Sequence, residues 1–172
     1  DYAKISGIEV GTNMRFNKHL SSYGNIAYQV ARGKSNSARE STLQIAQTGE
    51  VPLTSEQYLA WDRPWRINAG LIFAPDSSLR FIGMRLDGLR AFLSFNYTSG
   101  FRYTPQEKIG ANDLGRPMYQ EQTDRYLQEI ASAWVNFDLK LSYNLMLNRA
   151  NRKGIIFSVE VRNLLNNKNA QI

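Results

Sequence analysis

Residues 8–16 read Ile-Glu-Val-Gly-Thr-Asn-Met-Arg-Phe, and their pattern indicates the fold class. Its alternate residues form one set without charge (Ile8, Val10, Thr12, Met14, Phe16), and the residues between them are Glu9, Gly11, Asn13 and Arg15. Residues 135–143 repeat the split, with Val135, Phe137, Leu139, Leu141 and Tyr143 set against Asn136, Asp138, Lys140 and Ser142. Alternation with period two predicts β-strands that have one apolar face.

Six such strands can be drawn along the chain, at Ile5–Phe16, Leu20–Ala31, Trp65–Phe73, Leu89–Tyr103, Ser132–Leu145 and Ile155–Leu165. The connections between them alternate between short and long, and the long ones are the polar stretches 32–64 and 104–131. Thr54 or Ser55 is expected to cap a short helix that runs through Tyr58. The piece Leu79–Gly88 receives no assignment.

This organisation predicts an all-β fold, namely an antiparallel up-and-down transmembrane β-barrel fragment of about six strands from a larger barrel. Tilted strands of about nine to eleven residues cross a bilayer, whereas strands in soluble sheets average about five to six residues. In an antiparallel meander both long connections emerge at the same end, as the outer loops of such barrels do.

A soluble β-sandwich or lipocalin-like barrel would show the same periodicity with its apolar face turned inward. Two observations favour the membrane barrel. Aromatic residues gather near strand ends, as in interfacial girdles: Phe16, Tyr23, Trp61, Trp65, Phe101, Tyr103, Trp134 and Tyr143. The polar face also carries charges and amides that suit a water-filled lumen, and the predicted lumen-facing residues are Arg66, Asn68, Arg90, Asn96, Asp138, Lys140, Glu160 and Arg162.

The composition limits which partners and reactive sites this chain can have. The formal net charge is +6, but the basic residues are scattered and form no block typical of a nucleic-acid interface. No nucleic-acid partner is therefore expected. In an outer-membrane protein such cations would meet lipid phosphates. The sequence has no cysteine, and it has a single histidine, His19, in a predicted tight turn. We therefore expect no catalytic site, no metal site and no cofactor.

Three stretches carry a resemblance to one family. Residues 97–105, Tyr-Thr-Ser-Gly-Phe-Arg-Tyr-Thr-Pro, resemble the Y-x-S-G-x-x-Y-T-P strand end of TonB-dependent outer-membrane receptors. Residues 160–169 resemble the E-V-x-N-L-x-N-x-x-N segment near the end of such barrels, and Leu53–Leu71 resembles a descent from an outer loop into a strand. In that third stretch Trp65 stands where the family often has histidine. The relatives implied are large Bacteroidetes-type members with a carboxypeptidase-regulatory-like N-terminal domain.

The resemblance implies TonB-coupled uptake, across the outer membrane of a bacterial cell, of a scarce or large substrate such as a siderophore, a glycan or a peptide. Such receptors hold a plug inside a barrel of about 22 strands. We therefore expect residues 1–172 to be one wall of that barrel, without the plug, the N-terminal domain and the last strands. The expected partners are outer-membrane lipid and lipopolysaccharide, TonB through regions outside this chain, and a surface lipoprotein.

Aromatic and cationic side chains of the two long loops are the candidate substrate ligands, because they can stack on sugars or bind anions. They are Tyr58, Trp61, Arg63, Arg102, Tyr119, Arg125 and Tyr126.

Two other functions stay open. The chain could be a segment of another large outer-membrane barrel with a secretion or structural role. It could also be a soluble β-rich binding domain that folds in water without detergent.

Overall fold

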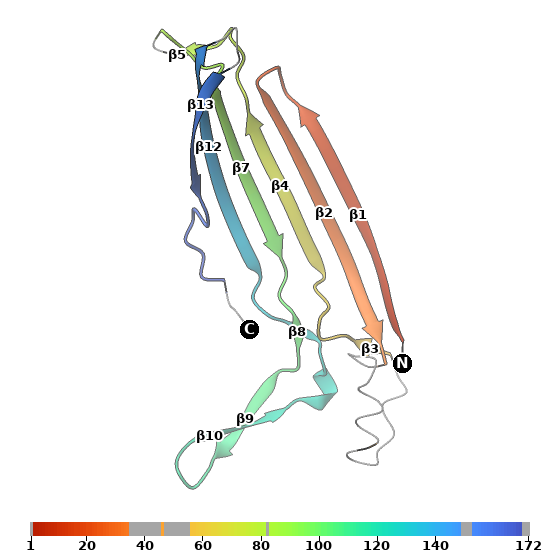
Figure 1. Ribbon diagram of the computed structural model, residues 1–172. Coiled ribbons are helices and arrows are strands. Elements are labelled where there is room, and N and C mark those ends of the chain that lie inside the picture. Colours follow the sequence, from red (N-terminus) through yellow and green to blue (C-terminus); the bar gives the residue numbers. More distant parts are fainter. Residues whose placement is uncertain (1, 35–45, 47–55, 82, 149–152, 170–172) are drawn as a thin grey trace. The chain divides into compact units, whose positions relative to one another are not determined.

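The structure is a computed structural model that describes residues 2–34, 46, 56–81, 83–148 and 153–169. It is all-β, and its main element is an antiparallel sheet, as the alternating sequence predicts. Each long strand of that sheet is hydrogen-bonded to the next one along the chain, so the topology is a meander (Figure 1). The long strands are β1 (Ala3–Arg15), β2 (Leu20–Gly33), β4 (Trp65–Phe73), β7 (Leu89–Thr98), β12 (Trp134–Asn148) and β13 (Lys153–Val161). Among the described residues the sheet is open, with β1 and β13 at its ends.

Short strands occupy the connections. The strand β3 (Gln57–Tyr58) pairs with the end of β2, where Tyr58 lies opposite Arg32. Three separate two-stranded ribbons are formed by β5 (Arg80–Phe81) with β6 (Met84–Arg85), by β8 (Arg102–Tyr103) with β11 (Glu129–Ile130), and by β9 (Gln106–Ala111) with β10 (Pro117–Glu121). A 3-10 turn, η1 (Thr123–Arg125), lies between β10 and β11.

Several predicted boundaries are wrong. The fourth strand does not run to Tyr103 but ends at Thr98, because Arg102 and Tyr103 pair with β11 and not with the main sheet. The sixth ends at Val161 rather than Leu165. The helix expected to run through Tyr58 is instead a strand at Gln57–Tyr58, and its expected caps Thr54 and Ser55 lie outside the described residues.

A cap of asparagines follows β13. The backbone enters the left-handed region at Asn163 (φ 52°) and Asn166 (φ 51°). The side chain of Asn169 then bonds both backbone groups of Val135, accepting from its N–H at 2.8 Å and donating to its carbonyl at 3.0 Å. The Leu164 N–H donates to the carbonyl of Phe137 at 2.7 Å. This segment therefore lies along the part of β12 that β13 does not reach, since the β12–β13 pairing begins at Leu139.

The chain divides into two compact units. Unit 1 comprises Asp1–Ile8, Ala27–Trp65 and Ser99–Ala133, and unit 2 comprises Glu9–Ile26, Arg66–Thr98 and Trp134–Ile172. The strands β1 and β2 contribute residues to both.

In unit 2 the strand register separates apolar from polar rows. Directly opposed residues on β4, β7 and β12 form three apolar rows: Ile67–Tyr97–Val135, Ala69–Phe95–Phe137 and Leu71–Leu93–Leu139. The rows between them are Asn68–Asn96–Asn136 and Gly70–Ser94–Asp138. Because side chains alternate between the two faces of a sheet, each set occupies its own face.

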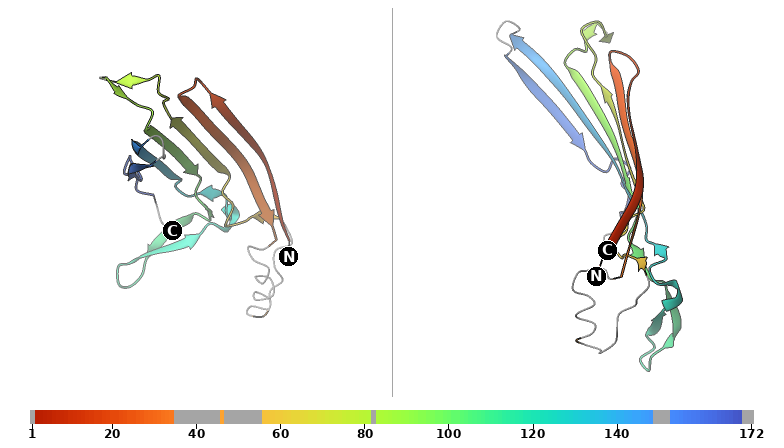
Figure 2. Two further views of the ribbon diagram at one scale, coloured as in Figure 1. Left: turned by 45° about the horizontal axis from the view of Figure 1, so that its top comes forward. Right: turned by 90° about the vertical axis from the view of Figure 1, so that its right-hand side faces the viewer.

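The apolar face of unit 2 is uncovered. Both views in Figure 2 show the strands of this unit as a single layer. The buried apolar side chains among the described residues are Ala31, Leu59 and Leu127, and all three belong to unit 1. On β13, by contrast, Val159 is 63% exposed.

No helix among the described residues has the length and apolar character needed to span a membrane.

Candidate functional site

The candidate site lies in unit 1 and begins with the segment that follows β3. The Leu59 N–H donates to the carbonyl of Ala31 at 3.1 Å, and the buried Leu59 side chain packs against Gly33. A side chain at position 33 would meet the backbone of Tyr2, so glycine is required where these strands and Leu59 come together. This packing fixes Tyr58 next to the end of β2.

A buried ion pair joins the two long connections. The Asp62 side chain is 0% exposed and the Arg102 side chain 8%. The Nε of Arg102 donates to Asp62 Oδ2 at 2.7 Å, and the Ala31 N–H donates to Asp62 Oδ1 at 3.0 Å. The Arg102 guanidinium also lies 3.6 Å from the centre of the Tyr58 ring and donates to the Gln128 carbonyl at 3.4 Å. One arginine thus connects segments 56–62 and 123–128.

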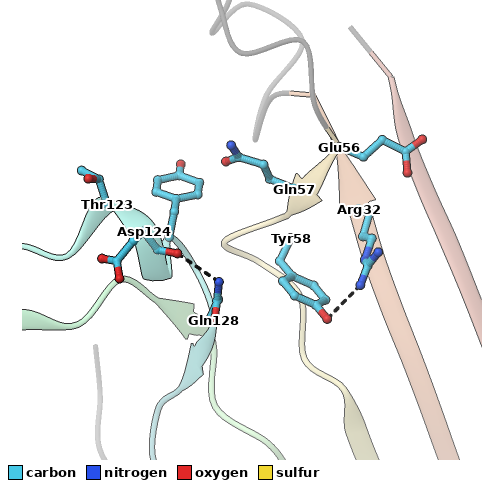
Figure 3. A pocket seen from close by; sticks show the side chains of 8 residues that line it. Arg32, Glu56, Gln57, Tyr58, Thr123, Asp124 and Gln128 are labelled. Carbon is cyan, nitrogen blue, oxygen red and sulfur yellow. Dashed lines mark hydrogen bonds between the residues drawn. The ribbon is translucent and has the colours of Figure 1, made fainter.

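A cavity of about 260 Å³ lies where these two segments face each other (Figure 3). Its lining residues are Arg32, Glu56, Gln57, Tyr58, Thr123, Asp124, Tyr126 and Gln128. The lining is mostly polar side chains and two tyrosines.

A strained turn forms one side of the cavity. Leu127 has a positive φ of 51°, which is uncommon for a bulky residue. Its side chain is buried, and its N–H donates to Thr104 Oγ1 at 3.2 Å. The Gln128 side chain donates to the carbonyl of Asp124 at 3.2 Å, which closes the turn. Burial of Leu127 and these two bonds hold the strained conformation in place.

The groups that face the cavity are mostly uncharged hydrogen-bonding groups. In Figure 3 the amide of Gln57 extends toward the turn that carries Asp124, whereas the carboxylate of Glu56 points away. Glu56 instead accepts a hydrogen bond from the hydroxyl of Tyr2, and this bond raises the pKa of Tyr2. Such a lining can bind hydroxyl or amide groups. Among the described residues no group of three or more acidic, histidine or cysteine side chains could hold a metal ion.

The structure brings together three of the seven predicted substrate ligands. Tyr58 and Tyr126 line the cavity, and Arg102 contacts Tyr58. Arg102 is largely buried in its ion pair, so its charge is neutralised inside the protein.

The other four do not line the cavity. Arg63 lies over the ring of Phe101 at 3.7 Å, and its Nε has no hydrogen-bond partner. Arg125 pairs with Glu129. Trp61 is partly exposed, and Tyr119 is 58% exposed on β10, opposite Lys108.

Six lining residues were not predicted: Arg32, Glu56, Gln57, Thr123, Asp124 and Gln128. The sequence holds only one indirect signal for them, which is that most are direct or near neighbours of Tyr58 and Tyr126.

The predicted lumen-facing residues fall on the polar rows of unit 2. Asn68 and Asn96 lie opposite each other, Asp138 lies opposite Ser94, and Arg90 lies opposite Ser142. Lys140 pairs in register with Glu160, whose carboxylate accepts from Arg162 at 2.6 Å. Arg66 lies opposite Thr98 on the same face. That this face borders a lumen stays a prediction.

Comparisons with known proteins add no identification: no protein-family model, curated protein or solved structure matches this chain.

Proposed function

We propose that this chain is a wall segment of an outer-membrane β-barrel that takes up its substrate by TonB-coupled transport. One observation carries the membrane part of the proposal. Unit 2 has an apolar face that no other described part of that unit covers, and directly behind it a face of amides and charges.

Energetics support a lipid environment for the apolar face. Each buried Val, Leu, Ile or Phe side chain gains about 1.5–3 kcal/mol over leaving it in water. A water-soluble sheet gains this energy by packing on a second layer, and unit 2 is a single layer. Hydrocarbon chains would supply the missing contact, while water in a lumen would solvate the row Asn68–Asn96–Asn136.

The transport part of the proposal is supported by the cavity in unit 1 and by the family resemblance of residues 97–105 and 160–169. The cavity lies among the long connections, and loops carry binding function more often than the scaffold does. A substrate would first contact the polar lining around Tyr58 and Tyr126.

Two adjacent residues on β7 provide the membrane test. Leu93 belongs to an apolar row and Ser94 to a polar row. In the complete native polypeptide, refolded into phospholipid vesicles, Leu93→Arg should lower the free energy of unfolding by about 2–4 kcal/mol. Ser94→Arg should change it by less than about 1 kcal/mol. Equal effects of the two arginines would refute the assignment of the faces.

A secretion channel without TonB coupling is the second candidate, since it would use the same sheet. Binding to the periplasmic domain of TonB distinguishes a TonB-coupled receptor from such a channel. We expect the complete polypeptide to bind this domain, with stronger binding when the substrate is present. Failure to bind TonB, in a protein that inserts normally, would favour the channel.

A further inference from the structure

Two aromatic rings lie side by side on the polar face of unit 2. Phe92 is two residues from Ser94 on β7, so its side chain shares the face of the polar rows. The ring of Tyr23 occupies the space directly above Gly70, which belongs to one of those rows. The two rings are nearly parallel, at 17°, and their centres are 6.3 Å apart. We call Tyr23 and Phe92 the aromatic pair.

Glycine at position 70 makes this arrangement possible. Tyr23 lies on β2 and Phe92 on β7, and β4 runs between these two strands, so the rings can meet only above β4. A side chain at position 70 would overlap the Tyr23 ring. Both aromatic residues are partly exposed. Because unit 2 is a single layer, the rings form a surface that a ligand on the polar face can contact.

Two cations lie beside the aromatic pair on the same face. Lys140 on β12 is directly opposite Phe92, and Arg90 is two residues before Phe92 on β7. Both cations belong to exposed residues. No ion pair between residues that the structure describes includes either of them.

The carboxylates of this face bond to other groups. Asp138 accepts from the N–H of Asn163 at 2.9 Å. Glu160, which lies opposite Lys140, accepts from Arg162 at 2.6 Å. An excess of positive charge therefore remains next to the aromatic pair.

A sugar ring that carries a carboxylate matches these features. The C–H groups of a sugar pack on aromatic rings, its hydroxyls bond to amides such as those of Asn68 and Asn96, and its carboxylate bonds to Lys or Arg. We propose that the aromatic pair, Lys140 and Arg90 bind a uronic-acid ring of an acidic oligosaccharide that passes along the wall of the lumen. This site shares no residue with the cavity in unit 1. The inference rests on the proposed function and names one substrate class for it.

The test measures uptake by cells whose outer membrane contains the complete polypeptide. The probes are radiolabelled short oligomers of galacturonic, glucuronic or mannuronic acid, each compared with its neutral methyl ester below saturation. We expect at least one acidic oligomer to enter faster than its ester. Lys140→Gln should slow the uptake of that oligomer about tenfold and leave that of its ester unchanged. The control Lys108→Gln, on the exposed β9–β10 ribbon, should change neither rate.

The two faces of β7 supply a control for the rings. Phe95 belongs to an apolar row, where its ring lies 4.7 Å from that of Phe137 between centres. Phe92→Leu should slow the uptake of both the acid and its ester about threefold to tenfold, and Tyr23→Leu should do the same. Phe95→Leu removes the same atoms from the opposite face and should change uptake less than about twofold. All rates are compared at equal amounts of protein in the outer membrane.

Three results would overturn the inference. Equal effects of Phe92→Leu and Phe95→Leu would mean that the rings act only through packing. Equal effects of Lys140→Gln on the acid and its ester would mean that the carboxylate is not recognised. Normal insertion without uptake of any acidic oligomer would mean that the site does not serve this substrate class. A polypeptide that does not insert into the outer membrane would instead refute the proposed function, so the two failures are distinguishable.

Discussion

At the scale of single residues, the pair Asp62–Arg102 has the largest expected effect. Breaking a buried pair costs about 3–5 kcal/mol, because the remaining charge stays desolvated. Asp62→Ala would also leave the Ala31 N–H without its acceptor. We expect this variant to lower the free energy of unfolding by that amount, measured by urea titration with tryptophan fluorescence.

The matched control for that variant is Glu129→Ala, which breaks the exposed pair with Arg125. Exposed ion pairs contribute about 0.2–1 kcal/mol. Comparable losses in the two variants would contradict the role given to burial.

A second prediction at this scale concerns pH. Hydrogen bonds from Ser78, and then the Lys18 ammonium, hold the pKa of Asp76 well below its usual range. The ionised form is therefore favoured by folding. Its contribution to stability is complete above the ordinary carboxyl pKa of about 4, and it is lost as pH falls through the lowered value.

Carbon-detected NMR of the Asp76 carboxyl should show its titration midpoint below that of an ordinary aspartate. Ser78→Ala should raise the midpoint toward the ordinary value, and Ser77→Ala should leave it in place. A wild-type midpoint near 4 would show that the Ser78 bonds do not form in solution.

At the scale of elements, periodicity predicted the long strands well wherever pairing is regular. The range of β4, Trp65–Phe73, is the predicted one. The fourth strand was predicted too long because Arg102 and Tyr103 keep the alternating pattern, yet they pair with β11 and not with the main sheet. Alternation reports that a residue is in a strand but does not report which strand it pairs with.

The cavity was less predictable than the strands. Tyr58 and Tyr126 are far apart in sequence, and they come together through Arg102, Asp62 and the strained turn at Leu127. No local pattern encodes such contacts. The aromatic and cationic character of the loops identified some of the participants, while the lining amides Gln57 and Gln128 carry no signal of their own.

The fit of β2 against β4 gives a prediction at this scale. A side chain at Gly70 would overlap the ring of Tyr23, which itself stacks on Phe92 with ring centres 6.3 Å apart. Gly70→Ala should therefore displace the ring and cost about 1–3 kcal/mol. Gly24→Ala is the control, because its added carbon would meet Thr12 at an ordinary 3.5 Å. Urea unfolding of both variants measures the change in their free energy of unfolding. Equal changes in Gly70→Ala and Gly24→Ala would show that the Tyr23 ring moves aside without cost.

At the scale of the whole molecule, the open sheet makes a prediction about size. The strands β1 and β13 end the hydrogen-bonded path among the described residues. A transmembrane sheet must be closed, because unpaired backbone groups in hydrocarbon cost several kcal/mol each. If the proposed function is right, the native polypeptide in outer-membrane extracts should have an intact mass several times that of 172 residues. A native mass equal to that of this chain would refute the large-barrel proposal.

The asparagine cap after β13 has a consequence for how the chain avoids misassembly. An exposed strand edge is a template on which a foreign strand can add, and proteins protect such edges. Here the side-chain amide of Asn169 satisfies both backbone groups of Val135, and the Leu164 N–H occupies the carbonyl of Phe137. An asparagine amide can do this because it has a donor and an acceptor in the same arrangement as a peptide group. The end of β12 is thereby protected from strand addition by one side-chain amide and one backbone N–H, without a further β-strand.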